Sequence, residues 1–107
     1  MKVYISGKIT GDPNYWEKFL WAQEDLERQG FTVLNPADLP EGMRPADYMR
    51  ICLSMMESAD VVAFLPDYTE SRGAQLEWAW CQYVGKTTMY LSVMSFYRPY
   101  PREEAQP

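Results

Sequence analysis

The residues that could do chemistry are concentrated in one segment, residues 71–77. Ser71 can cap the start of a helix, and Gly73 lets a ligand or another backbone come close to the first turn. Glu77 lies further along the same helix among apolar neighbours, where an unpaired carboxylate is unfavourable and therefore needs a reason. We interpret Glu77 as a reactive carboxylate in a ligand site. A structural salt bridge or an exposed position is the alternative.

A second segment of interest is residues 7–11, Gly-Lys-Ile-Thr-Gly. It follows a strand pattern and precedes a helix pattern, so its backbone amides could bind a phosphate beside the amino end of the helix. The segment matches neither the Walker sequence nor the dinucleotide-binding fingerprint. A tight turn that requires glycine is therefore an equal alternative.

The composition restricts other kinds of chemistry. The chain has no histidine, so any acid-base catalysis falls to carboxylates, hydroxyls, thiols or lysines. Its two cysteines, Cys52 and Cys81, lie in apolar helical patterns without the spacing of a metal site or a disulfide framework. We expect both to be small buried hydrophobic residues, and we expect no metal site.

Length and charge limit the class of protein. A chain of 107 residues that is 47% hydrophobic and 15% aromatic predicts one packed domain. A net charge of −5 without a basic cluster argues against binding to polymeric nucleic acid. No run approaches the roughly 18 apolar residues of a membrane span, and residues 1–5 lead into a strand rather than a signal peptide. The sequence thus predicts a cytoplasmic protein that binds a small molecule and no membrane.

Strand and helix patterns alternate along the chain. Short apolar or β-branched runs predict strands at residues 2–6, 31–34, 61–65 and 87–91. We expect Asp12 to cap the first helix, with Pro13 at its first position, and Gly85 to end the third helix, residues 71–84. The second helix is expected to bury one face, formed by Tyr48, Ile51, Cys52, Met55 and Ala59.

This alternation implies right-handed crossovers and a parallel sheet. The predicted fold class is α/β: a single-domain, flavodoxin-like or Rossmann-like three-layer sandwich with a short parallel sheet of about four strands. We assign residues 1–93 to this domain and residues 94–107 to an extended, proline-rich tail. Ligands of such folds bind beyond the carboxyl ends of the strands, so residues 4–11 and 71–77 should border one crevice.

The third helix is apolar on two faces. One face carries Ala74, Trp78 and Cys81, and the other carries Leu76, Ala79, Trp80 and Tyr83. Because one sheet cannot cover both faces, we expect a homodimer or higher homo-oligomer with this helix at or near the interface.

Four short motifs occur in a recognisable order. They are Tyr4-Ile5-Ser6-Gly7, Asn35-Pro36, Ala59-Asp60-Val61-Val62 and Ser71-x-Gly73-x-x-x-Glu77. Over most of the chain, this order and spacing resemble the nucleoside 2-deoxyribosyltransferase-like superfamily. Within it, the sequence is most similar to a group of small bacterial and phage proteins that begin with a similar Tyr-Ile-Ser-Gly segment, the DUF4406 family.

The resemblance implies roles for individual residues. Glu77 would be the nucleophile that attacks the anomeric carbon of a deoxyribose, with Tyr4 beside it as the second catalytic candidate. Neither a metal nor an organic cofactor is implied. The candidate substrate-binding residues are Ser6, Gly7, Lys8, Ile9, Gly11, Cys52, Asp67, Ser71 and Gly73. Asp60, Asp67 and Glu70 are the nearest candidates for a second carboxylate.

Two positions bear on the reaction. In the superfamily, transferases tend to carry Asp where this chain has Ser71, whereas hydrolases of deoxynucleoside monophosphates carry Ser for the 5′-phosphate. Ser71 therefore favours a nucleotide. Relatives of both kinds have a catalytic Asp where this chain has Cys52, and a neutral thiol is a poor substitute for that acid.

The sequence leaves more than one function open. The leading hypothesis is an N-glycosidase, namely a 2′-deoxynucleoside 5′-monophosphate hydrolase, or a nucleoside deoxyribosyltransferase, with Glu77 as nucleophile. Two alternatives are a nucleotide-binding module that has lost turnover through Cys52 and a small oligomeric interaction protein.

Overall fold

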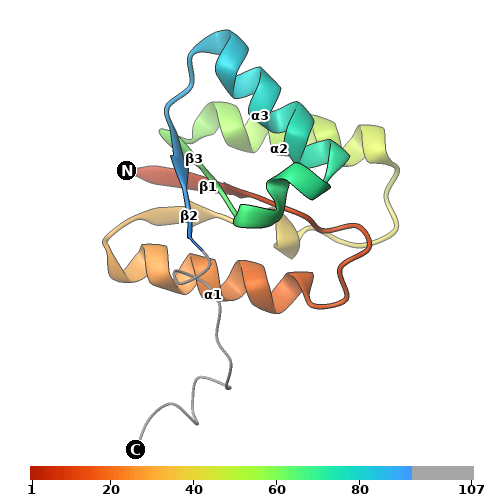
Figure 1. Ribbon diagram of the computed structural model, residues 1–107, viewed down its shortest axis with the longest axis horizontal. Helices are drawn as coiled ribbons and strands as arrows, with labels where there is room; N and C mark the ends of the chain where they lie inside the picture. The colour runs from red at the N-terminus through yellow and green to blue at the C-terminus, as the bar shows by residue number, and fades with distance from the viewer. Residues whose placement is uncertain (93–107) are drawn as a thin grey trace, which may run out of the picture.

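Four parallel strands form the middle layer of the molecule (Figure 1). The computed structural model describes residues 1–92, so the tail predicted at residues 94–107 lies outside the described residues. The strands stand in the order β2-β1-β3-β4, and each neighbouring pair is parallel. Their bounds are β1 Lys2–Ser6, β2 Thr32–Leu34, β3 Val61–Phe64 and β4 Thr88–Tyr90.

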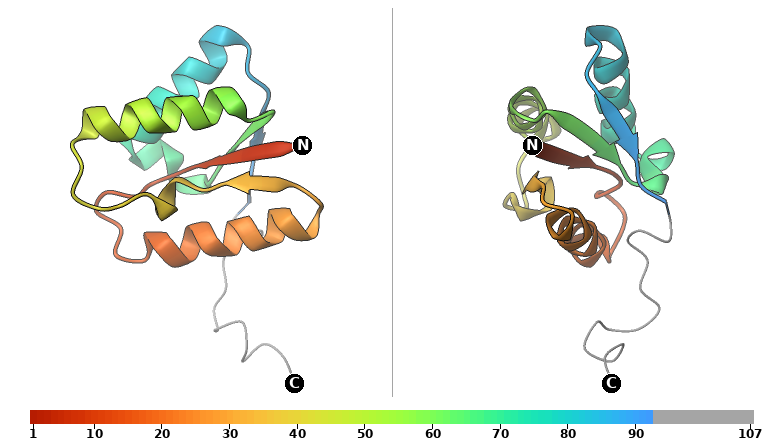
Figure 2. Two further views of the ribbon diagram at one scale, coloured as in Figure 1. Left: turned by 180° about the vertical axis from the view of Figure 1, so that it is seen from behind. Right: turned by 90° about the vertical axis from the view of Figure 1, so that its left-hand side faces the viewer.

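Helices cover both faces of this sheet (Figure 2). Helix α1, Tyr15–Arg28, packs on one face, while α2, Pro45–Ser58, and α3, Arg72–Val84, pack on the other. Two 3₁₀ turns follow strand ends: η1, Pro36–Asp38, after β2, and η2, Pro66–Glu70, after β3. The predicted α/β, flavodoxin-like three-layer class is confirmed. None of the helices in residues 1–92 is long and apolar enough to cross a membrane.

The alternation of side chains along β1 decides what faces the site. Val3 and Ile5 are buried in the α1 layer, whereas Tyr4 belongs to the buried cluster under α2 and α3. Successive residues of a strand point to opposite faces, so Ser6 shares the face of Tyr4. Strand β1 therefore presents two hydroxyls to the layer that contains α3.

The start of α1 differs from the prediction. The helix begins at Tyr15, and Asn14 rather than Asp12 occupies the N-cap position. The Asp12 carboxylate accepts a hydrogen bond from the Asn14 amide and forms an ion pair with Lys18. Asp12 and Pro13 thus belong to the turn before the helix, and the Asp12 carboxylate binds the Lys18 side chain near the start of α1.

The buried stripe of α2 is also shifted from the prediction. Met56 is fully buried, whereas Ile51 is 37% exposed. The buried stripe runs through Cys52, Met56 and Ala59, since these residues pack on Tyr4 and β3 in one cluster. Ile51 lies on the outer side of the helix.

Helix α3 buries only one of its two apolar faces. Ala74 and Cys81 are buried against the sheet, and Gly85 ends the helix as predicted, in the left-handed conformation. Of the predicted second face, Leu76, Ala79 and Tyr83 are exposed, Tyr83 to 92%, whereas Trp80 is half-buried and packs against the cluster that contains Tyr4 and Cys52. The rest of the second apolar face of α3 is therefore open in the single chain.

Candidate functional site

The centre of the site is the carboxylate of Glu77, which is only 7% exposed. The Tyr4 hydroxyl donates a hydrogen bond to Oε2 at 2.9 Å, and the Ser6 hydroxyl donates one to Oε1 at 2.7 Å. No ion pair formed by residues 1–92 involves Glu77. The salt-bridge and exposed alternatives for this residue are therefore wrong: two hydroxyls of β1 hold a buried carboxylate.

The electrostatics of this group follow from its burial. Burial raises the pKa of Glu77 above its usual value, although the hydrogen bonds from Ser6 and Tyr4 oppose the rise. The pKa of Tyr4 lies well above its usual value, first because the phenol is buried and then because of the charge on Glu77. Among residues 1–92, no neighbouring cation balances the charge of the Glu77 carboxylate.

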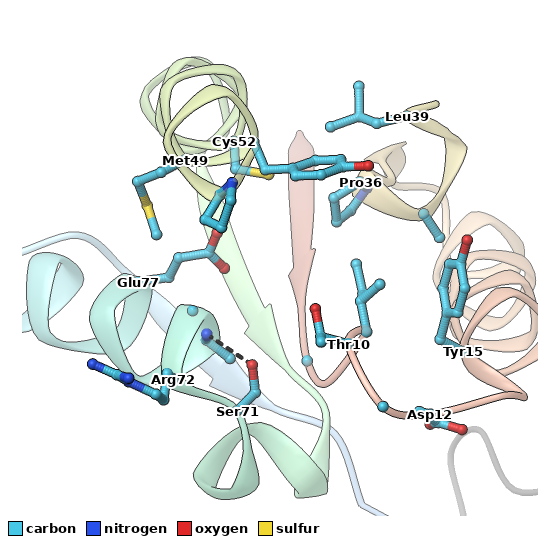
Figure 3. Close-up of a pocket in the computed structure, with 18 of the residues that line it drawn as sticks. Thr10, Asp12, Tyr15, Pro36, Leu39, Met49, Cys52, Ser71, Arg72 and Glu77 are labelled. Atoms are coloured by element: carbon cyan, nitrogen blue, oxygen red, sulfur yellow. Dashed lines mark hydrogen bonds between the residues drawn. The ribbon is translucent and has the colours of Figure 1, made fainter. Parts of the chain in front are cut away.

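Glu77 opens into a large crevice (Figure 3). The crevice has a volume of about 1340 Å³, more than the roughly 300–1,000 Å³ of common small-molecule sites. Its walls come from the loop after β1, from η1 and the first half of α2, and from the start of α3. As the fold class predicts, this is the carboxyl edge of the sheet.

The start of α3 presents backbone donors to the crevice. The Ser71 hydroxyl accepts a hydrogen bond from the Ala74 amide at 3.2 Å and so caps the helix. The amides of Arg72 and Gly73 occupy the first helical positions, which have no intrahelical acceptor, at the positive end of the helix. A Cβ on Gly73 would meet only Ser71 Oγ, at 3.9 Å, so packing within residues 1–92 does not require glycine there.

The packing and backbone conformation of the loop after β1 require its two glycines. A Cβ on Gly7 would lie 2.6 Å from Leu65 Cδ1, and Gly11 has a φ of +85°. The turn alternative thus accounts for Gly11, whereas close packing against Leu65 accounts for Gly7. Both also line the crevice, together with Ile9 and Thr10.

Lys18 is a residue that the sequence analysis missed. It is 8% exposed, and its ammonium group donates to the carboxylates of Asp12 and Asp67 and to the Lys8 carbonyl. Asp67 also accepts a hydrogen bond from the Lys8 amide at 3.1 Å. Lys18 therefore joins α1 to the two loops that follow β1 and β3. The only signal in the sequence was a charged residue next to Phe19 in the apolar stripe of α1.

The structure brings together most of the predicted site residues, but not all. Tyr4, Gly7, Ile9, Gly11, Cys52, Ser71, Gly73 and Glu77 line the crevice. Ser6, Lys8 and Asp67 do not. Ser6 binds Glu77 instead, and the Asp67 carboxylate turns to Lys18. Lys8 reaches Glu70 at 3.9 Å on the exposed rim.

The candidates for a second carboxylate are not poised beside Glu77. Asp60 precedes β3, at the opposite end of the sheet, where it accepts a hydrogen bond from the Lys2 amide. Asp67 is paired with Lys18, and the side chain of Glu70 is 67% exposed. Among residues 1–92, no group of His, Cys, Asp or Glu side chains could hold a metal ion.

We expect Lys18→Met to lower the free energy of unfolding by about 3 kcal/mol, because it leaves two partly buried carboxylates without their cation. Chemical denaturation would measure the loss. Lys2→Met is the matched control, since it removes a lysine whose pair with Asp60 is half exposed, and its loss of stability should be much smaller. Equal losses in the two variants would contradict a special role for Lys18.

Comparison with known proteins identifies the fold type and the family of this chain. Its fold is similar to that of a 2-deoxyribosyltransferase from the psychrotolerant bacterium Bacillus psychrosaccharolyticus, with a TM-score of 0.66 and 19% sequence identity over 89% of this chain and 80% of that chain. The protein has a nucleoside 2-deoxyribosyltransferase-like fold, as its motifs predict. The chain belongs to the family described as Domain of unknown function (DUF4406), which matches residues 1–90. No curated protein sequence matches it.

Proposed function

We propose that this protein is an N-glycosidase or deoxyribosyltransferase that acts on a nucleotide, with Glu77 as the nucleophile. The observation that carries the proposal is a buried carboxylate that faces a large crevice, is oriented by two hydroxyls and has no ion-pair partner within residues 1–92. The likeness in fold to a 2-deoxyribosyltransferase supports it. We assign the activity to residues 1–93, and the family match over residues 1–90 is consistent with that boundary.

The reaction would proceed in two steps at one carboxylate. Glu77 attacks the anomeric carbon and forms a glycosyl ester as the base departs, and water or a second base then displaces Glu77 with overall retention. Tyr4 and Ser6 act by positioning, because their hydrogen bonds fix both oxygens of the carboxylate. They also stabilise the charge that returns to Glu77 when the ester breaks.

The start of α3 is the proposed site of the 5′-phosphate. The free amides of Arg72 and Gly73, the Ser71 hydroxyl and the positive end of the helix all favour an anion there. Gly73 leaves the backbone uncovered on the crevice side. These features favour a nucleoside monophosphate over an unphosphorylated nucleoside and, with Ser71, hydrolysis over transfer.

The direct test is to incubate the protein with deoxynucleoside monophosphates and the matching nucleosides and to measure free base by chromatography. We expect base release from monophosphates, and none with Glu77→Gln. A binding module without turnover is the alternative that Cys52 favours, because the thiol stands in the crevice in place of an acid. That alternative predicts thermal stabilisation by the same ligands without base release.

We expect Ser71→Asp to weaken monophosphate binding by about tenfold or more and to spare unphosphorylated nucleosides. Asp retains the ability to cap α3, so folding should be preserved, but its charge would repel the phosphate. A hydrogen bond to a charged group is worth roughly 1.5–3 kcal/mol, which sets the size of the effect. Isothermal titration calorimetry with both ligands would measure it. Equal losses for the two ligands would show that Ser71 does not contact phosphate.

We further propose that two or more copies of the chain associate through the second apolar face of α3, defined by Leu76, Ala79 and Tyr83. Leu76 also lines the crevice, so the interface would border the site. Sedimentation at micromolar concentration should give at least a dimer, and Tyr83→Glu should shift it toward monomer. Trp16→Glu on α1 is the control, because Trp16 is exposed on the other side of the sheet. A monomeric wild-type protein would contradict the proposal.

A further inference from the structure

Glu77 lacks a counter-charge in the described part of the chain. Both of its oxygens accept hydrogen bonds, but the donors are the neutral hydroxyls of Tyr4 and Ser6. The ammonium group of Lys18 is paired with Asp12 and Asp67 and forms no ion pair with Glu77. A buried carboxylate in this state attracts a positive charge more strongly than an exposed one would. The crevice thus favours a ligand that carries a cation near Glu77.

The wall of the crevice next to Glu77, as formed by residues 1–92, offers no good proton donor. Figure 3 shows Met49 and Cys52 of α2 beside Glu77, with Leu39 and Pro36 further along the same side. The pKa of the Cys52 thiol is raised to about 11, chiefly because the thiol is buried; a hydrogen bond with Tyr4 opposes this rise, and the charge on Glu77 adds to it. A thiol of this kind is a weak acid at neutral pH.

The remaining acidic and phenolic groups of the crevice are committed elsewhere or lie away from Cys52 and Glu77, as the Tyr15 phenol of α1 does (Figure 3). The Tyr48 hydroxyl donates to the Pro40 carbonyl at 2.6 Å. Asp12 lies across the crevice from Cys52 and is paired with Lys18 (Figure 3). Glu41 and Glu70 are exposed on the rim. Within residues 1–92, the position from which a base would depart therefore has no poised acid.

The lack of an acid matters because an uncharged nucleobase needs a proton in order to leave. When the bond from C1′ to an uncharged base breaks, its electron pair stays on the base nitrogen, and a general acid that neutralises it is worth roughly 10²- to 10⁴-fold in rate. A base that is already positively charged leaves as a neutral molecule instead. The electron pair of the broken bond cancels the charge, and no proton is required.

We propose that the preferred substrate is a nucleotide whose base is cationic through its ring nitrogens, such as an N-glycosyl pyridinium or an N7-alkylated purine. This inference rests on the proposed function. The Glu77 oxygen bonds to C1′ while the C1′–N bond breaks and its electron pair passes into the base, which leaves neutral. Water then bonds to C1′, the ester C1′–O bond breaks with its electron pair returning to Glu77, and one water proton passes to solvent.

The test compares substrates that differ in charge. The matched pair is 7-methylguanosine 5′-monophosphate and guanosine 5′-monophosphate, each also as the 2′-deoxy form, and nicotinamide mononucleotide is the pyridinium arm. Base release is measured by chromatography and corrected for the rate without protein. We expect kcat/KM to be about 10²-fold or more higher for the methylated member of the pair. The kcat/KM for nicotinamide mononucleotide then shows which kind of cationic base is preferred.

Variants separate the inference from the function on which it rests. Cys52→Asp should lower the ratio of the two kcat/KM values, because a carboxyl group at that position can serve the uncharged base. Equal kcat/KM values for the matched pair in the wild type, or release from the uncharged member alone, would overturn the inference and leave the proposed function standing. Release from no substrate by either protein, or undiminished release by Glu77→Gln, would overturn the proposed function itself.

Discussion

Glu77→Gln is expected to lower base release by about 10⁴-fold or more, because it removes the proposed nucleophile and no other carboxylate of residues 1–92 is poised beside it. Gln has nearly the same shape as Glu and can still accept a hydrogen bond from Tyr4 or Ser6, so the fold should be kept. The measurement is kcat/KM on the best substrate, with circular dichroism to confirm folding. Activity that persists in Glu77→Gln would contradict the proposed mechanism.

The same variant should change how stability depends on pH. Because burial raises the pKa of Glu77 in the folded state above 4.5, the folded state binds more protons than the unfolded state between the two pKa values. Glu77 therefore makes the free energy of unfolding fall as pH rises through this window, and that loss persists above it. Glu77→Gln removes this pH-dependent loss of stability. The free energy of unfolding of the variant, relative to wild type, should therefore rise with pH from about pH 4.5 upward.

Denaturation at several pH values would test this expectation. Glu57→Gln is the matched control, because Glu57 is exposed on α2. A stability of Glu77→Gln that falls relative to wild type with rising pH would contradict the burial of an unbalanced charge at this position.

Cys52→Asp is expected to raise base release from nucleotides with uncharged bases by one or more powers of ten. The substitution adds an acid to the wall beside Glu77, where a general acid contributes roughly 10²- to 10⁴-fold. Burying a second carboxyl group near Glu77 should lower stability, since Cys52 is 7% exposed. Folding and rate must therefore be measured on the same preparation.

Cys52→Asn is the control for this gain. Asn has the shape of Asp but cannot donate a proton as an acid, so it should bring no comparable increase. A folded Cys52→Asp protein with no gain over wild type would argue that the missing acid does not limit the reaction. It would favour the binding module without turnover.

The arrangement of the elements could be predicted from the sequence because each one carries a local signal. The apolar run of β3, the Ser71 cap and the Gly85 stop are visible in a few consecutive residues, and the structure has each where the sequence indicates it. The start of α1 could not be predicted in the same way. Asp12 and Pro13 are typical of a helix start, but the Lys18 that pairs with Asp12 is also held by Asp67, which is distant in the sequence and meets it only in the folded chain.

In the candidate site, too, some features have a local sequence signal and others depend on contacts made in the folded chain. The spacing of Ser71, Gly73 and Glu77 and the resemblance of β1 to known motifs indicated that Tyr4 and Glu77 lie together, and their side chains are hydrogen bonded. The partners of the other polar residues were not predictable. Asp67 has two acceptor oxygens and several possible donors, and only the meeting of two loops with α1 decides that Lys18 binds it.

The central claim is that Glu77 forms a covalent glycosyl ester, and the configuration of the product tests it most directly. Base release in water that contains methanol gives a methyl glycoside, which does not interconvert between anomers, and its anomeric proton can be assigned by NMR. Two displacements at C1′ predict that a β-nucleotide gives the β-methyl glycoside. A product that is wholly the α-anomer would show a single direct displacement and would contradict a glycosyl ester on Glu77.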